Sequence, residues 1–177
     1  MSQEPQLEQR AEQHYAGIRT IVPMDGLSGA IDEALPQLFG WLAANGIGPS
    51  GPPFIRYLVI DMMASLRVEI GVPVAESVSP EIVGPAAGNG RIRPGSLPAG
   101  QYLVLRHVGP YAGLIASNAA LQDWAAARGV KFDTWDTPDG SAWRCRAEHY
   151  LTDPSAEPDP AKWETDIAYL TSPAPNL

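Results

Sequence analysis

The sequence has a single cysteine, no long apolar run and few basic residues. Cys145 is the one cysteine among 177 residues, so an internal disulfide is excluded. No apolar stretch approaches the roughly 20 residues that a membrane-spanning helix needs. The polar, acidic residues 1–13 are not typical of a signal peptide. We therefore expect a cytoplasmic protein with no membrane partner.

The scarcity of basic residues also bears on the binding partners. The formal net charge is -8, from 12 basic and 20 acidic residues. A nucleic-acid-binding protein needs a basic surface to neutralise phosphates, so direct nucleic-acid binding is not expected. An acidic surface weakly concentrates cations, but the same charge also serves solubility alone. Charge by itself leaves both roles open.

Motifs for metal, phosphate and nucleophilic chemistry are absent as well. His14, His107 and His149 have no metal-ligand spacing, and the glycines between residues 84 and 95 fit no phosphate-binding loop. The sequence contains no G-x-S-x-G motif. We expect no metal and no cofactor, and structural roles for the two strand histidines, His107 and His149.

What the chain does contain is a repeated pattern. The motif P-x-x-G-L occurs at residues 23–27 and again at 110–114, and each copy is followed by an apolar helical stretch with a tryptophan, Trp41 or Trp124. These tryptophans are expected to anchor helices in the core. The repetition predicts two copies of one structural unit.

Each copy is predicted to form a strand, a helix and two further strands. Gly46 and Gly129 mark the helix C-termini, where a left-handed residue is needed. Pro36 predicts a break or kink in the first helix. The β-branched and aromatic runs that predict strands are 18–22, 54–60, 66–74, 102–108, 143–151 and 165–170.

The predicted organisation is a single domain over residues 14–177 after a polar tail, 1–13. Within it, repeat one covers about 15–75, a Gly- and Pro-rich linker 76–98, and repeat two about 99–172. The fold class is α+β, with duplicated βαββ units in pseudo-twofold symmetry. Two antiparallel sheets are expected to form a central ligand groove, with the helices on the opposite face.

Strand alternation selects candidate site residues in the last hairpin. Arg144, Arg146, Glu148 and Tyr150 share one face, and the more apolar alternate set, including Cys145, is expected to face the helices. A carboxylate among aromatic rings attracts a delocalised cation through Coulomb attraction and the ring quadrupoles. A salt bridge on a solvated sheet face explains the same pattern, so both interpretations stay open.

Other candidates are weaker on sequence grounds. Glu69 follows the same alternation logic, with an exposed salt bridge as the alternative. Tyr169 fits core packing equally well, and Met24 and Tyr111 fit packing at helix N-termini equally well. Trp163 follows an acidic loop, and its position fits either a loop clamp or a pocket lid. The candidate ligand-binding residues are Glu148, Tyr150, Tyr111, Tyr169, Trp163, Glu69, Met24 and Phe54.

Three segments resemble the GyrI-like, or AraC-type effector-binding, family: residues 52–74, 97–114 and 148–165. The resemblance extends over almost the whole chain after His14. It implies a duplicated βαββ fold of the SHS2-like type with a ligand pocket between the halves. In the multidrug-sensing members of the family, a pocket glutamate on the penultimate strand contacts cationic dyes and drugs. Glu148 matches that position, and Tyr150 follows it.

The resemblance implies three functional hypotheses. The first is a stand-alone binder of lipophilic, cationic, aromatic xenobiotics, a monomer or weak dimer. The second is a hydrolase of cyclopropane-bearing alkylating compounds, with Glu148 and Tyr150 as catalytic residues. The third is a gyrase-binding or transcription-regulatory partner module. Family members often carry a DNA-binding helix-turn-helix domain, and the short segment before the first strand predicts none here.

Overall fold

The computed structural model describes residues 3–61, 65–77 and 91–173. Its elements, in chain order, are β1 Gln6–Arg10, β2 Gln13–Val22, η1 Met24–Gly26, α1 Leu27–Ala44, β3 Phe54–Asp61, β4 Ser65–Pro73, β5 Ile92–Leu97, β6 Gly100–Val108, η3 Tyr111–Gly113, α3 Leu114–Arg128, β7 Thr134–Thr137, β8 Gly140–Trp143, β9 Arg146–Tyr150, η4 Pro160–Lys162 and β10 Glu164–Leu170. Neither α1 nor α3 is long and apolar enough to cross a membrane.

All ten described strands belong to one antiparallel sheet. Its order is β1-β6-β10-β9-β3-β4-β2-β5, with β8 pairing β3 and β7 pairing β8. The halves of the chain meet where β9 pairs with β3, with Ile55 opposite Glu148. The expectation of two separate sheets is therefore wrong. Pairing β3 with β9 satisfies backbone groups that two separate sheets would leave at open edges.

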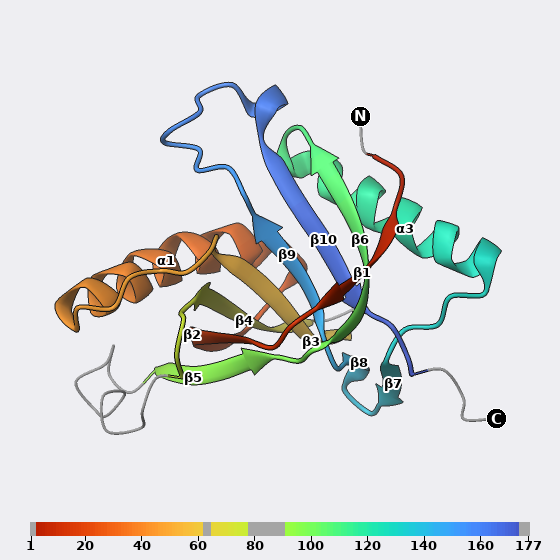
Figure 1. Cartoon of the computed structure of the whole chain (residues 1–177), viewed down its shortest axis with the longest axis horizontal. Coiled ribbons are helices and arrows are strands. Elements are labelled where there is room, and N and C mark those ends of the chain that lie inside the picture. The colour runs from red at the N-terminus through yellow and green to blue at the C-terminus, as the bar shows by residue number, and fades with distance from the viewer. Residues whose placement is uncertain (1–2, 62–64, 78–90, 174–177) are drawn as a thin grey trace.

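The two helices pack on the same face of the sheet, α1 on one half and α3 on the other, and they lie well apart (Figure 1). Leu38 and Trp41 of α1 pack on Ile18 and other residues of β2, β3 and β4. Leu121 of α3 packs on Leu105 and other residues of β6 and β10. Each helix thus buries its apolar stripe on its own half of the sheet, as amphipathic helices must.

The opposite face of the sheet is also buried, because the sheet curls around it. Strands from distant positions in the sheet order contribute to one cluster on this face: Tyr15, Phe54, Leu97, Tyr102, Val104, Cys145, Ala168 and Leu170. The prediction that the apolar set of the last hairpin faces the helices is wrong for Cys145, whereas Trp143 and Leu151 of that set do line the helical side. Cys145 packs inside the curl, away from both helices.

Three further expectations differ from the structure. The predicted polar tail contains β1, which pairs with β6, and the predicted linker contains β5, which pairs with β2. Pro36 does not interrupt α1, because buried residues on both sides of it, Ala34 and Leu38, anchor the helix to the sheet. The remainder of the linker, residues 78–90, lies outside the described residues.

Candidate ligand-binding site

A cavity of about 1200 Å³ lies on the helical face of the sheet. Its walls come from α1 and α3, and its floor comes from β3, β8 and β9. The expectation of a groove on the face opposite the helices is therefore wrong. Each helix covers only its own half of the sheet, so the junction of the halves, with Tyr57, Glu148 and Tyr150, is left as the floor of a cavity.

Glu148 lies at the centre of this floor. Its side chain is 5% exposed. It accepts hydrogen bonds from the Tyr57 hydroxyl at 2.8 Å, from Asn118 Nδ2 at 2.9 Å and from the Tyr150 hydroxyl at 3.4 Å. Among the residues that the structure describes, no Lys, Arg or His forms an ion pair with it. Its negative charge is held by neutral donors.

The two tyrosines on Glu148 are strongly perturbed. Burial, and then the neighbouring Glu148 charge, raises the pKa of both Tyr57 and Tyr150 well above the ordinary value. Both causes disfavour the phenolate, which is the charged form. The two hydroxyls therefore stay protonated and remain hydrogen-bond donors to the carboxylate.

Asn118 on α3 is held in place by a polar chain that runs into the core. Its Nδ2 also donates to the Leu114 carbonyl at 2.8 Å, and its Oδ1 accepts from the Tyr169 hydroxyl at 2.6 Å. Gln122 Nε2 donates to the same hydroxyl at 3.2 Å. Tyr169 is fully buried, so it does not line the cavity. It fixes the orientation of Asn118 toward Glu148.

Sequence reasoning missed Asn118 and Tyr57. Asn118 follows Leu114 by one helical turn and shares its face with Leu121, so it interrupts the apolar stripe of α3. A polar residue in a buried stripe is the signal that could have revealed it. Tyr57 follows Ile55 by two residues on β3, so both side chains lie on the helical face.

An aromatic wall closes the end of the cavity near the loop that follows β9. The Tyr111 ring lies 5.5 Å from the Tyr150 ring and 4.8 Å from the Trp163 ring, measured between centroids. Trp163 is fixed by a hydrogen bond from its Nε1 to the Glu157 carbonyl at 2.8 Å. Tyr111 lines the cavity, and Trp163 stacks behind it without lining it.

The charge around the cavity is mainly negative. Asp25, Asp32 and Asp153 line it together with Glu148, and Arg146 is the one Lys or Arg among the described residues that line it. A concave surface lined by one sign of charge concentrates ions of the opposite sign. The electrostatics of the cavity therefore favour positively charged ligands.

Two other predicted candidates lie on the opposite face of the sheet. Glu69 accepts hydrogen bonds from the Tyr15 hydroxyl and from Arg19 Nε, the latter at 2.9 Å. Phe54 is fully buried inside the curl. Neither lines the cavity, because both alternate with residues that face the helices. The side chain of Met24 lies outside the described residues.

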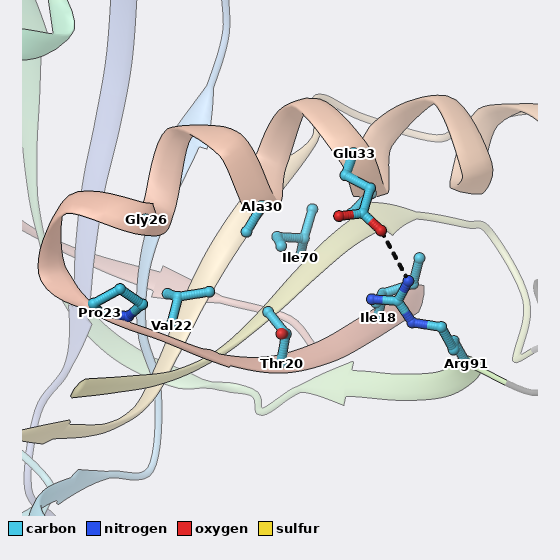
Figure 2. A pocket seen from close by; sticks show the side chains of 10 residues that line it. Ile18, Thr20, Val22, Pro23, Gly26, Ala30, Glu33, Ile70 and Arg91 are labelled. Carbon is cyan, nitrogen blue, oxygen red and sulfur yellow. Dashed lines mark hydrogen bonds and ion pairs between the residues drawn. The ribbon is translucent and has the colours of Figure 1, made fainter.

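A second, smaller hollow lies between β2 and α1, with an ion pair between Glu33 and Arg91 at 3.3 Å (Figure 2). Its volume is about 230 Å³. Small-molecule sites commonly measure about 300–1000 Å³, so this hollow is a weaker candidate than the main cavity.

Histidine and cysteine side chains form no metal site in the described part of the chain, where no group of three or more potential ligands occurs. His107 is buried, with Nε2 2.9 Å from the Pro110 carbonyl and Nδ1 2.7 Å from Ser117 Oγ. A carbonyl only accepts, so Nε2 carries the proton. His107 ties β6 to the start of α3.

Several solved structures share this fold. The EcmrR C-terminal domain is 20% identical, with a TM-score of 0.73 and coverage of 97% of this chain and 98% of that chain. A hydrolase from Listeria innocua is 18% identical, with a TM-score of 0.63 and coverage of 96% and 92%. SAV2435 bound to tetraphenylphosphonium is 13% identical, with a TM-score of 0.62 and coverage of 96% and 94%. These likenesses show the fold.

The chain also matches EcmrR in its DNA complex, at 21% identity and a TM-score of 0.73, and spans 58% of that longer protein. No curated protein matches the chain. A family model described as the GyrI-like small molecule binding domain matches residues 3–169, which is nearly the whole chain. With a large cavity at the junction of its two halves, the chain belongs to the GyrI-like family of small-molecule-binding domains.

Proposed function

We propose that the chain binds lipophilic cations with several aromatic rings in the cavity between α1 and α3, and that Glu148 selects for positive charge. The observation that carries this proposal is the Glu148 carboxylate, 5% exposed on the cavity floor and bonded only to neutral donors. A charge in a poorly solvated cavity interacts more strongly with an opposite charge than one in bulk water does.

The aromatic lining supplies the rest of the affinity. Tyr57, Tyr111, Trp143 and Tyr150 present rings to the cavity. Apolar area removed from water contributes about 25 cal/mol per Å², and ring faces add cation–π attraction. SAV2435, which has the same fold, is described as bound to tetraphenylphosphonium, a cation of this type. That description supports the same ligand class here.

The test replaces the carboxylate by an amide of the same shape. Glu148→Gln is expected to weaken tetraphenylphosphonium binding by about 10- to 100-fold, since a close charge pair is worth a few kcal/mol in a partly dry site. Binding of neutral triphenylphosphine oxide should change little. Isothermal titration calorimetry on both ligands measures the difference.

The matched control is Glu69→Gln, which removes another 5% exposed carboxylate on the opposite face of the sheet. It should leave the affinity for both ligands close to that of the wild type. Charge selection by Glu148 would be rejected if Glu148→Gln lost the same affinity for the charged and the neutral ligand. It would also be rejected if Glu69→Gln lost as much affinity for tetraphenylphosphonium as Glu148→Gln does.

The same groups support a second candidate function, the hydrolysis of strained rings. Glu148 is a buried carboxylate with two tyrosine hydroxyls at 2.8 and 3.4 Å, an arrangement of a base beside protonated donors. In this reaction Glu148 accepts a proton from water, and the water oxygen attacks a cyclopropane carbon. The electrons of the broken C–C bond pass to a conjugated carbonyl oxygen, which Tyr150 protonates. The proton that Glu148 took from water then passes to the Tyr150 oxygen, so both side chains return to their starting forms.

Turnover is detected as the water adduct of a cyclopropane-bearing alkylating compound by mass spectrometry. If the chain is a hydrolase, the wild type forms this adduct and Glu148→Gln does not. One neighbour of the same fold is described as a hydrolase, which supports making the measurement. Adduct formation no faster than in Glu148→Gln would leave binding as the function.

A further inference from the structure

Arg146 is a basic residue inside a cavity whose other charged lining residues are acidic. It lies on β9 two residues before Glu148, so both side chains face the helices. Alternate residues on a strand are about 6.6–6.8 Å apart. That figure is the backbone spacing, so the cavity floor carries a positive and a negative side chain as neighbours on the same face of one strand.

The guanidinium of Arg146 is held by three aromatic rings. Its Cζ lies 4.6 Å from the centroid of Tyr169, 4.7 Å from Trp143 and 5.6 Å from Tyr57. Planar guanidinium groups stack on aromatic faces and so lose conformational freedom before any ligand arrives. The position of the charge is thus set by the protein.

The same guanidinium has no anionic partner. No carboxylate lies within 4.0 Å of it in the described residues, and its buried Nε has no hydrogen-bond partner. Arg144, two residues earlier, is different: it is exposed and pairs with Asp133 at 3.0 Å. A buried donor without an acceptor is costly, and a charged one more so.

We infer that Arg146 forms an acidic-group subsite, and that the preferred ligands are aromatic zwitterions, with a cationic group toward Glu148 and a carboxylate toward Arg146. Arginine pairs with carboxylates through two parallel hydrogen bonds, which fixes the orientation of the bound ring system. Such a ligand compensates both charges of the cavity floor, whereas a simple cation leaves Arg146 without an anionic partner. The inference rests on the proposed function and narrows its ligand class.

Two dyes that differ by one methyl ester test the inference. Rhodamine 110 carries a cationic xanthene and a free carboxylate, and rhodamine 123 is its methyl ester, a simple cation. Arg146→Gln is expected to weaken the binding of rhodamine 110 by about tenfold, the value of one charge-assisted pair. The same change should leave the affinity for rhodamine 123 unchanged or raise it. Fluorescence anisotropy titrations give the ratio of the two dissociation constants.

The matched control is Arg144→Gln, the same change on the same chain segment outside the cavity, which should keep the wild-type ratio. Arg146→Lys keeps the charge and should restore part of the preference for rhodamine 110. Thermal melting checks that each variant is folded. If Arg146→Gln strongly lowers the melting temperature of the protein, the ratio of the two dissociation constants is compared between Arg146→Lys and the wild type instead.

Three outcomes would overturn the inference. Arg146→Gln could weaken both dyes equally, which indicates a packing role, or tighten both, which indicates that Arg146 only repels cations. Bound rhodamine 110 could lose its visible band, which marks the neutral lactone form. In all three cases rhodamine 123 still binds and still depends on Glu148. Loss of that dependence would instead reject the proposed function.

Discussion

Replacing Phe54 with alanine is expected to lower the free energy of unfolding by about 3–5 kcal/mol. The ring is 0% exposed and lies edge-on to Tyr15, with 4.9 Å between the centroids. It also covers Gly71 of β4, directly opposite in the register, where a Cβ would lie 2.5 Å from Phe54 Cζ. The neighbouring strands cannot collapse into the space that the ring leaves. Urea unfolding followed by circular dichroism measures the loss.

Phe39→Ala is the matched control. Phe39 on α1 is 39% exposed and lines the cavity, so its removal should change stability little and weaken the binding of a lipophilic cation. Phe54→Ala at a temperature where it is still folded should bind the same cation nearly as well as the wild type. A stable Phe54→Ala variant that has lost binding would place Phe54 in the ligand site.

Acidification is expected to destabilise the protein through His149. Burial, and secondarily the Arg10 charge, lowers the pKa of His149 from 6.5 to about 4, and Asp166 opposes this shift. The neutral imidazole is therefore favoured in the folded state. Between pH 6.5 and pH 4 the unfolded chain takes up a proton on this residue and the folded chain does not. The free energy of unfolding therefore decreases as the pH is lowered through this range.

The expected size of this loss is about 2–3 kcal/mol, since each pKa unit is worth about 1.4 kcal/mol and the ring, being half-buried, is partly screened. His149→Gln removes the titrating group. The variant should therefore lose about 2–3 kcal/mol less stability than the wild type between pH 6.5 and pH 4. Urea titrations across this range measure both slopes, and equal slopes would contradict the assignment to His149.

The side-chain alternation of β9 was read correctly, but its orientation was not. Arg146, Glu148 and Tyr150 share one face, because side chains alternate on any strand. Arg144, expected on the same face, precedes β9 and is exposed and paired with Asp133. The expectation that the more apolar set faces the helices assumes a single buried face. It fails for Cys145 but holds for Trp143 and Leu151, which line the cavity. Both faces are buried here, since the curl of the sheet encloses Cys145 and Phe54 without any helix. Alternation cannot tell one buried face from the other.

The sequence pattern also predicts the cavity on the wrong face of the sheet, for a related reason. The prediction that Glu148 lines the cavity still holds, because the face of Glu148 and the face of the cavity were both expected opposite the helices and both lie under them. The carboxylate lies at the junction of the halves, but under the helices rather than opposite them. Its partners Tyr57 and Asn118 come from β3 and α3, 91 and 30 residues away in the chain. No local pattern links residues at such separations.

Local features of this protein can be predicted from short stretches of its sequence: the end of α3 at Gly129, which adopts the left-handed conformation at φ 71°, the strand periodicity, and the family to which the chain belongs. These follow from backbone stereochemistry and from spacings within short segments. Contacts between distant parts of the chain set which face holds the cavity. Among the described residues they leave Glu148 without a cationic partner and Arg146 without an anionic one. Those properties depend on how β3 pairs with β9 and how far apart α1 and α3 lie, which are set by long-range packing.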